Sequence, residues 1–307
     1  MDFSHEPVML AECLAALDIK PDGVYVDGTA GGGGHSAAIA GRLTGGRLYA
    51  FDQDPDAIAA AGARLEGLPA QLVRANFRNA ATELAALGVE AIDGALLDLG
   101  VSSHQLDSAR RGFSYHADAP LDMRMSQSGP TAADLVNTLD RQALADILRE
   151  YGEEQYAWQI AGKLEATRAE APVETTGRLA EIIISAVPPA VRRKQKNPAR
   201  KSFQALRIAV NGELDALSEG LDALFGLLNP GGRLAVISFH SLEDRLVKQR
   251  FKGWATACTC PPELPVCVCG GVAKAKLVGK NPIVAAEDEQ ERNRRSRSAK
   301  LRVIEKL

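Results

Sequence analysis

The chain has 307 residues, of which 46% are hydrophobic and 24% charged, and its formal net charge is −3 at pH 7. This length predicts about two domains, and the composition excludes disordered, collagen-like and coiled-coil proteins. The apolar runs are much shorter than the roughly 20 residues that a membrane-spanning helix needs. The N-terminal residues do not have the pattern of a secretory signal, and five cysteines are too few for a disulfide framework in a chain of this length. We therefore expect a cytoplasmic protein with no membrane partner.

The first hundred residues alternate short apolar strands with helical patterns. The expected strands cover residues 24–27, 48–52, 71–75 and 95–98, and the expected helices cover 36–43, 55–65 and 79–87. This alternation predicts an α/β, Rossmann-like fold with a doubly wound, mostly parallel sheet. The carboxyl ends of parallel strands lie at one edge of such a sheet, where ligands bind.

The middle of the chain shows helical spacing only. Helices are expected at 132–138, 141–151, 153–168 and 177–187, with Asp140 as an N-cap, Gly152 as a stop and an exposed connection from Pro188 onward. The alternation returns with a helix at 203–228, a turn at 229–232 and a strand at 233–239. We therefore expect a core in two parts, residues 1–108 and 199–307, interrupted at 109–198 by a helical domain that recognises the substrate.

A glycine-rich loop follows the first expected strand, with the sequence Asp-Gly-Thr-Ala-Gly-Gly-Gly-Gly-His at residues 27–35. Glycines let a ligand approach the backbone closely. Dinucleotides place a pyrophosphate on such a loop, usually through G-x-G-x-x-G, whereas S-adenosylmethionine (SAM) has positive groups and no phosphate. The Asp27 carboxylate would repel a pyrophosphate and attract an ammonium or sulfonium. The loop thus favours SAM over NAD, and a turn without a ligand is the third interpretation.

Two further acids and one aromatic residue follow strands. Asp52 ends the second strand, where a carboxylate can bind the ribose hydroxyls of either cofactor. Asp98 ends the fourth strand and either caps a turn or faces the crevice between cofactor and substrate. Phe77, just past the third strand, is either a core residue or a ring that stacks on adenine.

Longer motifs extend to both ends of the chain. They include Phe51-Asp-Gln-Asp-Pro55, Leu97-Asp-Leu-Gly-Val-Ser-Ser103, Pro120-Leu-Asp-Met-Arg-Met125, Ile237-Ser-Phe-His-Ser-Leu-Glu-Asp-Arg245 and Arg295-Ser-Arg-Ser-Ala-Lys-Leu-Arg302. Together with the glycine-rich loop, these motifs resemble those of the bacterial 16S rRNA cytosine-N4 methyltransferases, the RsmH or MraW type. The resemblance implies SAM-dependent methylation of the N4 amine of a cytidine in 16S rRNA, near the decoding centre of the small ribosomal subunit.

The resemblance also implies a set of cofactor contacts. They are Gly33, Gly34, His35, Asp52, Phe77, Asp98 and Gln105. His104 and Arg294 stand where this family usually has proline, and neither is a contact side chain.

The chemistry of the reaction names two candidate catalytic residues. A cytosine amine is a poor nucleophile, so the enzyme must orient it by accepting hydrogen bonds from its N–H groups. Asp98 is the nearest acid at the end of the fourth strand, and His240 is a candidate proton shuttle. Another RNA or protein substrate, an NAD-dependent oxidoreductase and a non-enzymatic RNA-binding scaffold are the competing hypotheses.

The weakly negative net charge hides two basic runs, residues 192–201 and 291–302, each with six basic side chains. RNA binding requires phosphate contacts from lysine and arginine, so we expect both runs to line a groove that leads to the crevice. A solvated linker and a C-terminal tail are the alternatives. Phe113, Tyr115 and Trp254 are candidate stacking partners for a base.

Four of the five cysteines lie close together, at Cys258, Cys260, Cys267 and Cys269. Four thiolates can bind zinc tetrahedrally, although C-x-x-C is a more specific zinc spacing than C-x-C. Redox-sensitive thiols and a proline-rich loop of reduced cysteines are the other interpretations. Any metal would be structural, because the cluster lies far in sequence from the motifs that carry the chemistry.

Overall fold

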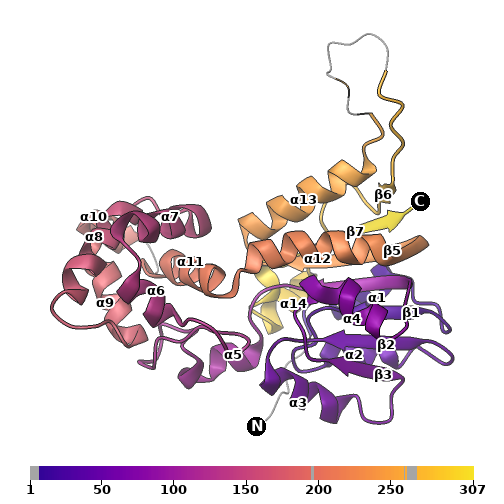
Figure 1. Ribbon diagram of the computed structural model, residues 1–307, viewed down its shortest axis with the longest axis horizontal. Helices are drawn as coiled ribbons and strands as arrows, with labels where there is room; N and C mark the ends of the chain where they lie inside the picture. Colours follow the sequence, from indigo (N-terminus) through magenta and orange to yellow (C-terminus); the bar gives the residue numbers. More distant parts are fainter. Residues whose placement is uncertain (1–6, 195–196, 259, 261–267) are drawn as a thin grey trace. The chain divides into compact units, whose positions relative to one another are not determined.

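The computed structural model describes residues 7–194, 197–258, 260 and 268–307 (Figure 1). The chain divides into two compact units, one of residues 1–100 with 214–307 and one of residues 101–213. The two ends of the chain together form the first unit, and the predicted insertion at 109–198 lies within the second. No helix in the described ranges combines the length and apolar character needed to cross a bilayer.

A seven-stranded sheet organises the first unit, with strand order β3-β2-β1-β4-β5-β7-β6 (Figure 1). The strands are β1 (Val24–Asp27), β2 (Arg47–Phe51), β3 (Ala70–Val73), β4 (Ile92–Asp98), β5 (Leu228–Ser238), β6 (Ala275–Leu277) and β7 (Lys300–Lys306). Strands β1 to β5 are parallel, and β7 runs antiparallel to β5 and β6. The predicted Rossmann-like, mostly parallel sheet is confirmed. Its strand order reverses between β1 and β4, and ligands bind at such a switch point, beyond the carboxyl ends of the strands.

Helices cover both faces of this sheet because residues along each strand alternate between the two sides. Tyr25 of β1 joins the core formed with α1 (Leu10–Leu17), α2 (Gly34–Ala40) and α3 (Pro55–Arg64). Val26 joins the core formed with α4 (Ala80–Ala86), α12 (Glu213–Leu227) and α13 (Ser241–Ala255). The shorter elements of this unit are η1 (Phe77–Asn79), α14 (Glu287–Arg292) and η3 (Ser296–Ser298).

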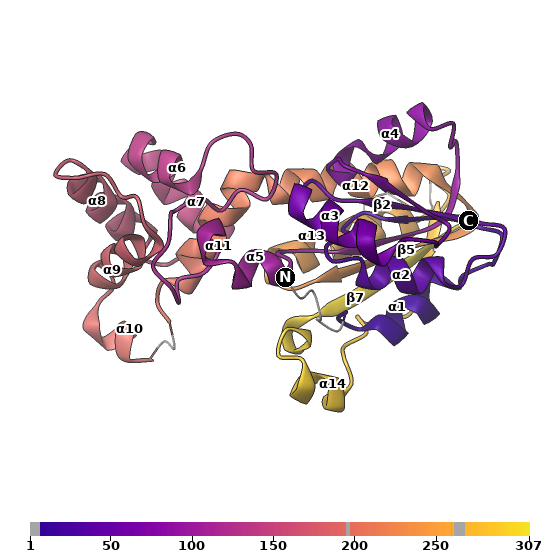
Figure 2. The ribbon, with the colours of Figure 1, turned by 90° about the horizontal axis from the view of Figure 1, so that it is seen from below.

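The second unit has helices and no strand among its described residues, apart from an isolated bridge between Pro120 and Thr175 (Figure 2). They are α5 (Ser103–Asp107), η2 (Ala109–Arg111), α6 (Ala132–Thr138), α7 (Arg141–Gly152), α8 (Ala157–Arg168), α9 (Thr176–Ala186), α10 (Pro189–Lys194) and α11 (Arg200–Asn211). Fully buried aliphatic side chains such as Leu144, Ile160 and Leu179 form their common core. The predicted cap is confirmed, since the Asp140 carboxylate accepts a hydrogen bond from the Ala143 N–H at 2.8 Å.

Several predicted boundaries are wrong, and backbone conformation accounts for most of them. The pattern at 203–228 is two helices, because Gly212 adopts a left-handed φ of 57° and ends α11. The helix expected from Glu153 starts later, because Glu153 has a left-handed φ of 47°. The expected exposed connection after Pro188 begins with the helix α10. The expected turn at 229–232 is present as a bulge within β5, since Ile92 pairs with Leu228 and Gly94 with Arg233, and Gly231 has a left-handed φ of 81°.

The sequence predicted no strand after residue 239, yet residues 300–306 pair with β5 as β7. Arg233 of β5 faces Glu305 of β7, and their side chains form an ion pair at 3.1 Å. Arg302 binds Asp244 of α13 at 2.7 Å. Part of the C-terminal basic run therefore stabilises the sheet, and the alternative of a solvated tail is wrong.

Candidate cofactor site

The glycine-rich loop leaves β1 at the switch point and turns sharply through two glycines. Gly31 and Gly33 adopt left-handed φ values of 51° and 78°. A Cβ atom on Gly33 would lie 3.1 Å from the Ala61 Cα atom of α3, and one on Gly34 would lie 2.5 Å from the Pro7 Cγ atom. The loop thus needs glycine at Gly33 for its conformation and at Gly34 for packing.

Asp27 holds this loop from inside. Its side chain is fully buried, one carboxylate oxygen accepts the Ser36 hydroxyl at 2.6 Å, and the other accepts the Thr29 N–H at 3.1 Å. Burial raises the pKa of Asp27, and His35 and these hydrogen bonds oppose the rise. Sequence reasoning pointed the Asp27 carboxylate at a cationic ligand, whereas in the structure it fixes the shape of the loop.

Asp52 connects the end of β2 to the glycine-rich loop. Its two carboxylate oxygens accept the N–H groups of Gly31 and Asp54, each at 2.8 Å. Burial raises the pKa of Asp52 to about 6, against the effect of these two hydrogen bonds. Each carboxylate oxygen has a further lone pair, so the two oxygens can still accept ribose hydroxyls, and that role stays a prediction.

Asp98 carries the most unusual carboxylate of the site. Its Oδ2 atom lies 3.6 Å from His35 Nδ1, while its Oδ1 atom is buried with no hydrogen-bond partner among the described residues. Burial raises the pKa of Asp98 to about 6, opposed by the charges of His35 and Arg295. A buried acceptor without a partner is costly, and a ligand with an N–H or O–H group would satisfy it.

His35 completes the cluster at the carboxyl end of β4. Its side chain is buried, and Nε2 lies 2.9 Å from the Val8 carbonyl oxygen. Because a carbonyl only accepts, Nε2 carries a proton, and Nδ1 is the ring nitrogen that faces Asp98. The glycine-rich loop thus contains Gly33, Gly34 and His35. It also contacts the carboxylate of Asp52 through Gly31 and the backbone of Asp98 through Thr29.

The Phe77 ring packs between the same loop and α12. A Cβ atom on Gly220 of α12 would lie 2.3 Å from Phe77 Cδ2, and one on Gly28 would lie 3.0 Å from Phe77 Cβ. The side chain is half-buried against the apolar core. Stacking on adenine stays a prediction, and the position of the ring depends on a glycine in α12.

His240 and Gln105 have structural contacts of their own. His240 caps α13 through Nδ1, which accepts the Glu243 N–H at 3.4 Å, and its Nε2 lies 3.0 Å from a Glu243 carboxylate oxygen. Gln105 belongs to the helical unit, where it is buried and forms a capping box with Ser102. Proton shuttling by His240 and cofactor contact by Gln105 stay predictions.

Three residues of the site escaped individual notice in the sequence. The Thr29 hydroxyl accepts the Asp98 main-chain N–H at 2.6 Å, Ser36 binds Asp27, and the charge of Arg295 lowers the pKa of Asp98. Thr29 lies in the glycine-rich loop, Ser36 directly follows it, and Arg295 lies in the C-terminal motif, so the motifs marked the right segments without identifying these contacts.

All three proposed stacking residues pack in or against the apolar cores. Trp254 stacks on Phe225 with ring centroids 4.0 Å apart, and Phe113 is buried in the helical unit. Tyr115 meets Phe203 edge-on at 5.5 Å. In the first basic run, residues 192–201, the side chains of residues 193, 200 and 201 are exposed.

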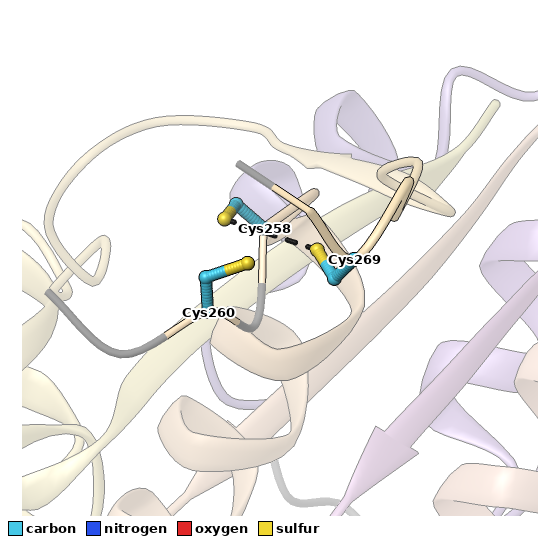
Figure 3. A group of neighbouring side chains, drawn as sticks. All are labelled: Cys258, Cys260 and Cys269. Carbon is cyan, nitrogen blue, oxygen red and sulfur yellow. Dashed lines mark hydrogen bonds between the residues drawn. The ribbon is translucent and has the colours of Figure 1, made fainter. Parts of the chain in front are cut away.

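Three of the four predicted zinc ligands lie together (Figure 3). The Sγ atoms of Cys258, Cys260 and Cys269 are all within 4.8 Å of one another. Cys267 lies outside the described residues.

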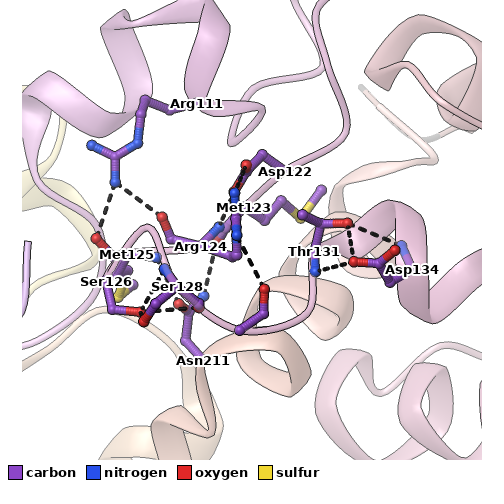
Figure 4. Close-up of polar contacts among 11 residues, drawn as sticks. Arg111, Asp122, Met123, Arg124, Met125, Ser126, Ser128, Thr131, Asp134 and Asn211 are labelled. Carbon is purple, nitrogen blue, oxygen red and sulfur yellow. Dashed lines mark hydrogen bonds and ion pairs between the residues drawn. The ribbon is translucent and has the colours of Figure 1, made fainter.

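The Pro120–Met125 motif forms a loop held by two side chains of the helical unit (Figure 4). The Arg111 guanidinium donates to the carbonyl oxygens of Arg124 and Met125 at 2.9 and 3.1 Å. Asn211 donates to the Met123 carbonyl oxygen and accepts the Met125 N–H, each at 2.8 Å. Met123 has a left-handed φ of 64°, a strained conformation that these hydrogen bonds fix.

This strand order, with an antiparallel β7 between β5 and β6, acids that end β1 and β4 and an acid directly after β2, defines a Rossmann-like methyltransferase. The chain belongs to the MraW methylase family, which it matches over residues 2–307. It is 53% identical over 311 residues to the ribosomal RNA small subunit methyltransferase H of Symbiobacterium thermophilum, covering 100% of this chain and 98% of that protein. It is 54% identical over 312 residues to the protein of the same name from Heliobacterium modesticaldum, covering 100% of both. The family predicted from the motifs is confirmed, and the oxidoreductase hypothesis is excluded.

Proposed function

We propose that this protein is a SAM-dependent methyltransferase that modifies the N4 amine of a cytidine in the 16S rRNA of the small ribosomal subunit. The observation that carries the proposal is the full-length similarity to proteins named as small-subunit rRNA methyltransferases. The motif resemblance supplies the finer details, namely the N4 amine and a cytidine near the decoding centre. A ribosomal substrate places the reaction in the cytoplasm.

The residues at the switch point fit SAM. The Asp98 Oδ1 atom, which has no partner among the described residues, can accept a hydrogen bond from a ligand. The pKa values of Asp52 and Asp98 are raised because nearby positive charges and hydrogen bonds do not fully offset the cost of burying the two negative charges. A positively charged ligand would stabilise both ionised forms. A pyrophosphate would add negative charge beside them, so the same electrostatics disfavour NAD.

Each of these residues has a role that follows from its position. Asp52 accepts hydrogen bonds from the ribose hydroxyls, Phe77 packs against the adenine, and the backbone at Gly33 and Gly34 lets the cofactor approach. When bound, SAM supplies a methyl group activated by its sulfonium. The protein contributes orientation and electrostatics, which in favourable cases are worth about 7–11 kcal/mol.

Asp98 is assigned first to the cofactor, since it lies beside the glycine-rich loop. If its unpartnered oxygen instead accepts an N–H of the cytosine amine, Asp98→Asn will lower kcat while the SAM dissociation constant stays unchanged. If it contacts the cofactor, the dissociation constant will rise.

The test is methyl transfer with identified products. The purified protein is incubated with methyl-labelled SAM and either 16S rRNA, isolated small subunits, transfer RNA or a protein extract, and the RNA is digested for nucleoside mass spectrometry. We expect label in 16S rRNA or small subunits, as N4-methylcytidine. Label in transfer RNA or protein, or a different methylated nucleoside, would refute the proposed substrate. The Asp52→Asn variant is the negative control.

A further inference from the structure

The segment 256–274 connects α13 to the edge strand β6 and has a closed base. The Lys274 N–H donates to the Trp254 carbonyl oxygen at 2.9 Å, so the two limbs start side by side. They stay close further out, where a Cβ atom on Gly271 would lie 2.0 Å from the Ala257 carbonyl oxygen. The close approach of the two limbs therefore requires glycine at position 271. This approach also brings the cysteines of the two limbs together.

The three described thiols have the spacing of a common ligand set (Figure 3). Sγ of Cys258 and Sγ of Cys269, one from each limb, are 3.9 Å apart, and Sγ of Cys260 lies within 4.8 Å of both. Four-coordinate zinc with Zn–S bonds of about 2.3 Å places its sulfurs roughly 3.8 Å apart. A disulfide instead requires about 2.05 Å, so the arrangement matches a shared ion and not a bonded pair.

Backbone N–H groups point at two of these sulfurs. The Val268 N–H donates to Cys260 Sγ and the Gly271 N–H to Cys269 Sγ, both at 3.4 Å. Such hydrogen bonds stabilise thiolates and orient metal ligands.

Apolar packing is sparse among the described residues of this loop. Val268 and Val272 are 77% and 81% exposed, so the described part of the loop buries little apolar surface. A bound metal can stabilise so small a unit in place of an apolar core.

We propose that Cys258, Cys260 and Cys269 bind one zinc ion that fixes this loop. The role is structural, because β6 lies three strands away from β4 and the acidic site. Zinc suits these ligands because thiolates bind borderline-soft divalent ions and the site has no redox requirement.

Metal content of the full chain tests the proposal directly. The protein is produced in zinc-supplemented medium, purified under reducing conditions without chelator and analysed by mass spectrometry of the elements. We expect one equivalent of zinc per chain, a loss of at least tenfold in Cys258→Ser and in Cys269→Ser, and no loss in Cys13→Ala. Cys13 is the matched control, because it is a cysteine of α1 buried in the core.

Cobalt substitution identifies the ligands. We expect a thiolate-to-cobalt charge-transfer band and intense visible bands of tetrahedral cobalt, both lost in Cys258→Ser, while SAM affinity measured by calorimetry stays unchanged and shows an intact fold. Reduced wild-type protein that holds no zinc after incubation and gel filtration would overturn the proposal. So would equal zinc in Cys258→Ser and wild type, which means an adventitious ion only.

Discussion

Replacing Asp98 by asparagine is expected to stabilise the protein while impairing its function. The Asp98 carboxylate has one buried oxygen without a partner among the described residues, and its pKa is raised from 3.8 to about 6. Asparagine is nearly the same size and carries no charge. Its amide group would lie beside His35, whose Nδ1 is 3.6 Å from Asp98 Oδ2.

The size of the effect follows from linkage. A rise in pKa from 3.8 to about 6 corresponds to about 3 kcal/mol between the protonated and ionised forms. Because the folded state holds this proton more tightly than the unfolded state, wild-type stability from this group is present below pH 4 and is lost as the pH rises through about 6. We expect Asp98→Asn to exceed wild type by up to about 3 kcal/mol at pH 8 and by only about 1 kcal/mol at pH 4.5.

Urea unfolding followed by tryptophan fluorescence measures this difference. The chain has two tryptophans, and a Trp158→Phe background leaves Trp254, which stacks on Phe225 in the sheet unit, as the reporter. Asp288→Asn is the control, because this side chain is 75% exposed and its loss should change stability by less than about 0.5 kcal/mol. An Asp98→Asn variant less stable than wild type at pH 8, or with an equal advantage at both pH values, would refute the reasoning.

Three further outcomes are expected. Gly220→Ala places a methyl group 2.3 Å from Phe77 Cδ2 and should lower the free energy of unfolding in urea by about 1–3 kcal/mol. Gly226→Ala, in the same helix with no described atom within 4 Å of the added methyl group, should be neutral or stabilising. Equal effects of the two variants would contradict the packing argument. Asp52→Asn should weaken SAM binding at least tenfold by calorimetry, and unchanged affinity would remove Asp52 from the site. Charge reversal of the basic side chains in residues 192–201 should weaken RNA binding. It should also reduce the slope of the logarithm of the binding constant against the logarithm of the salt concentration by about 1 for every phosphate that the variant no longer binds. An unaltered slope would exclude this run from the RNA-binding surface.

The sequence predicted those parts of the molecule that depend on neighbouring residues. The strand–helix alternation, the Asp140 cap and the glycine-rich loop are local patterns, and each lies where it was expected. Boundaries failed where one residue took an unusual conformation, as at Glu153 and Gly212, because a left-handed φ at a single position leaves the apolar periodicity unchanged.

The sequence by itself determined the class of fold, the family and the segments that meet at the sheet edge. Tertiary structure alone decided what each acid does there, because hydrogen-bond partners and burial come from distant residues. Asp27 has both oxygens satisfied within its loop, whereas Asp98, anchored to Thr29 across 69 positions of sequence, keeps one oxygen without a partner among the described atoms. The same holds for β7, which joins β5 only because the chain returns from residue 239 to the sheet at residue 300.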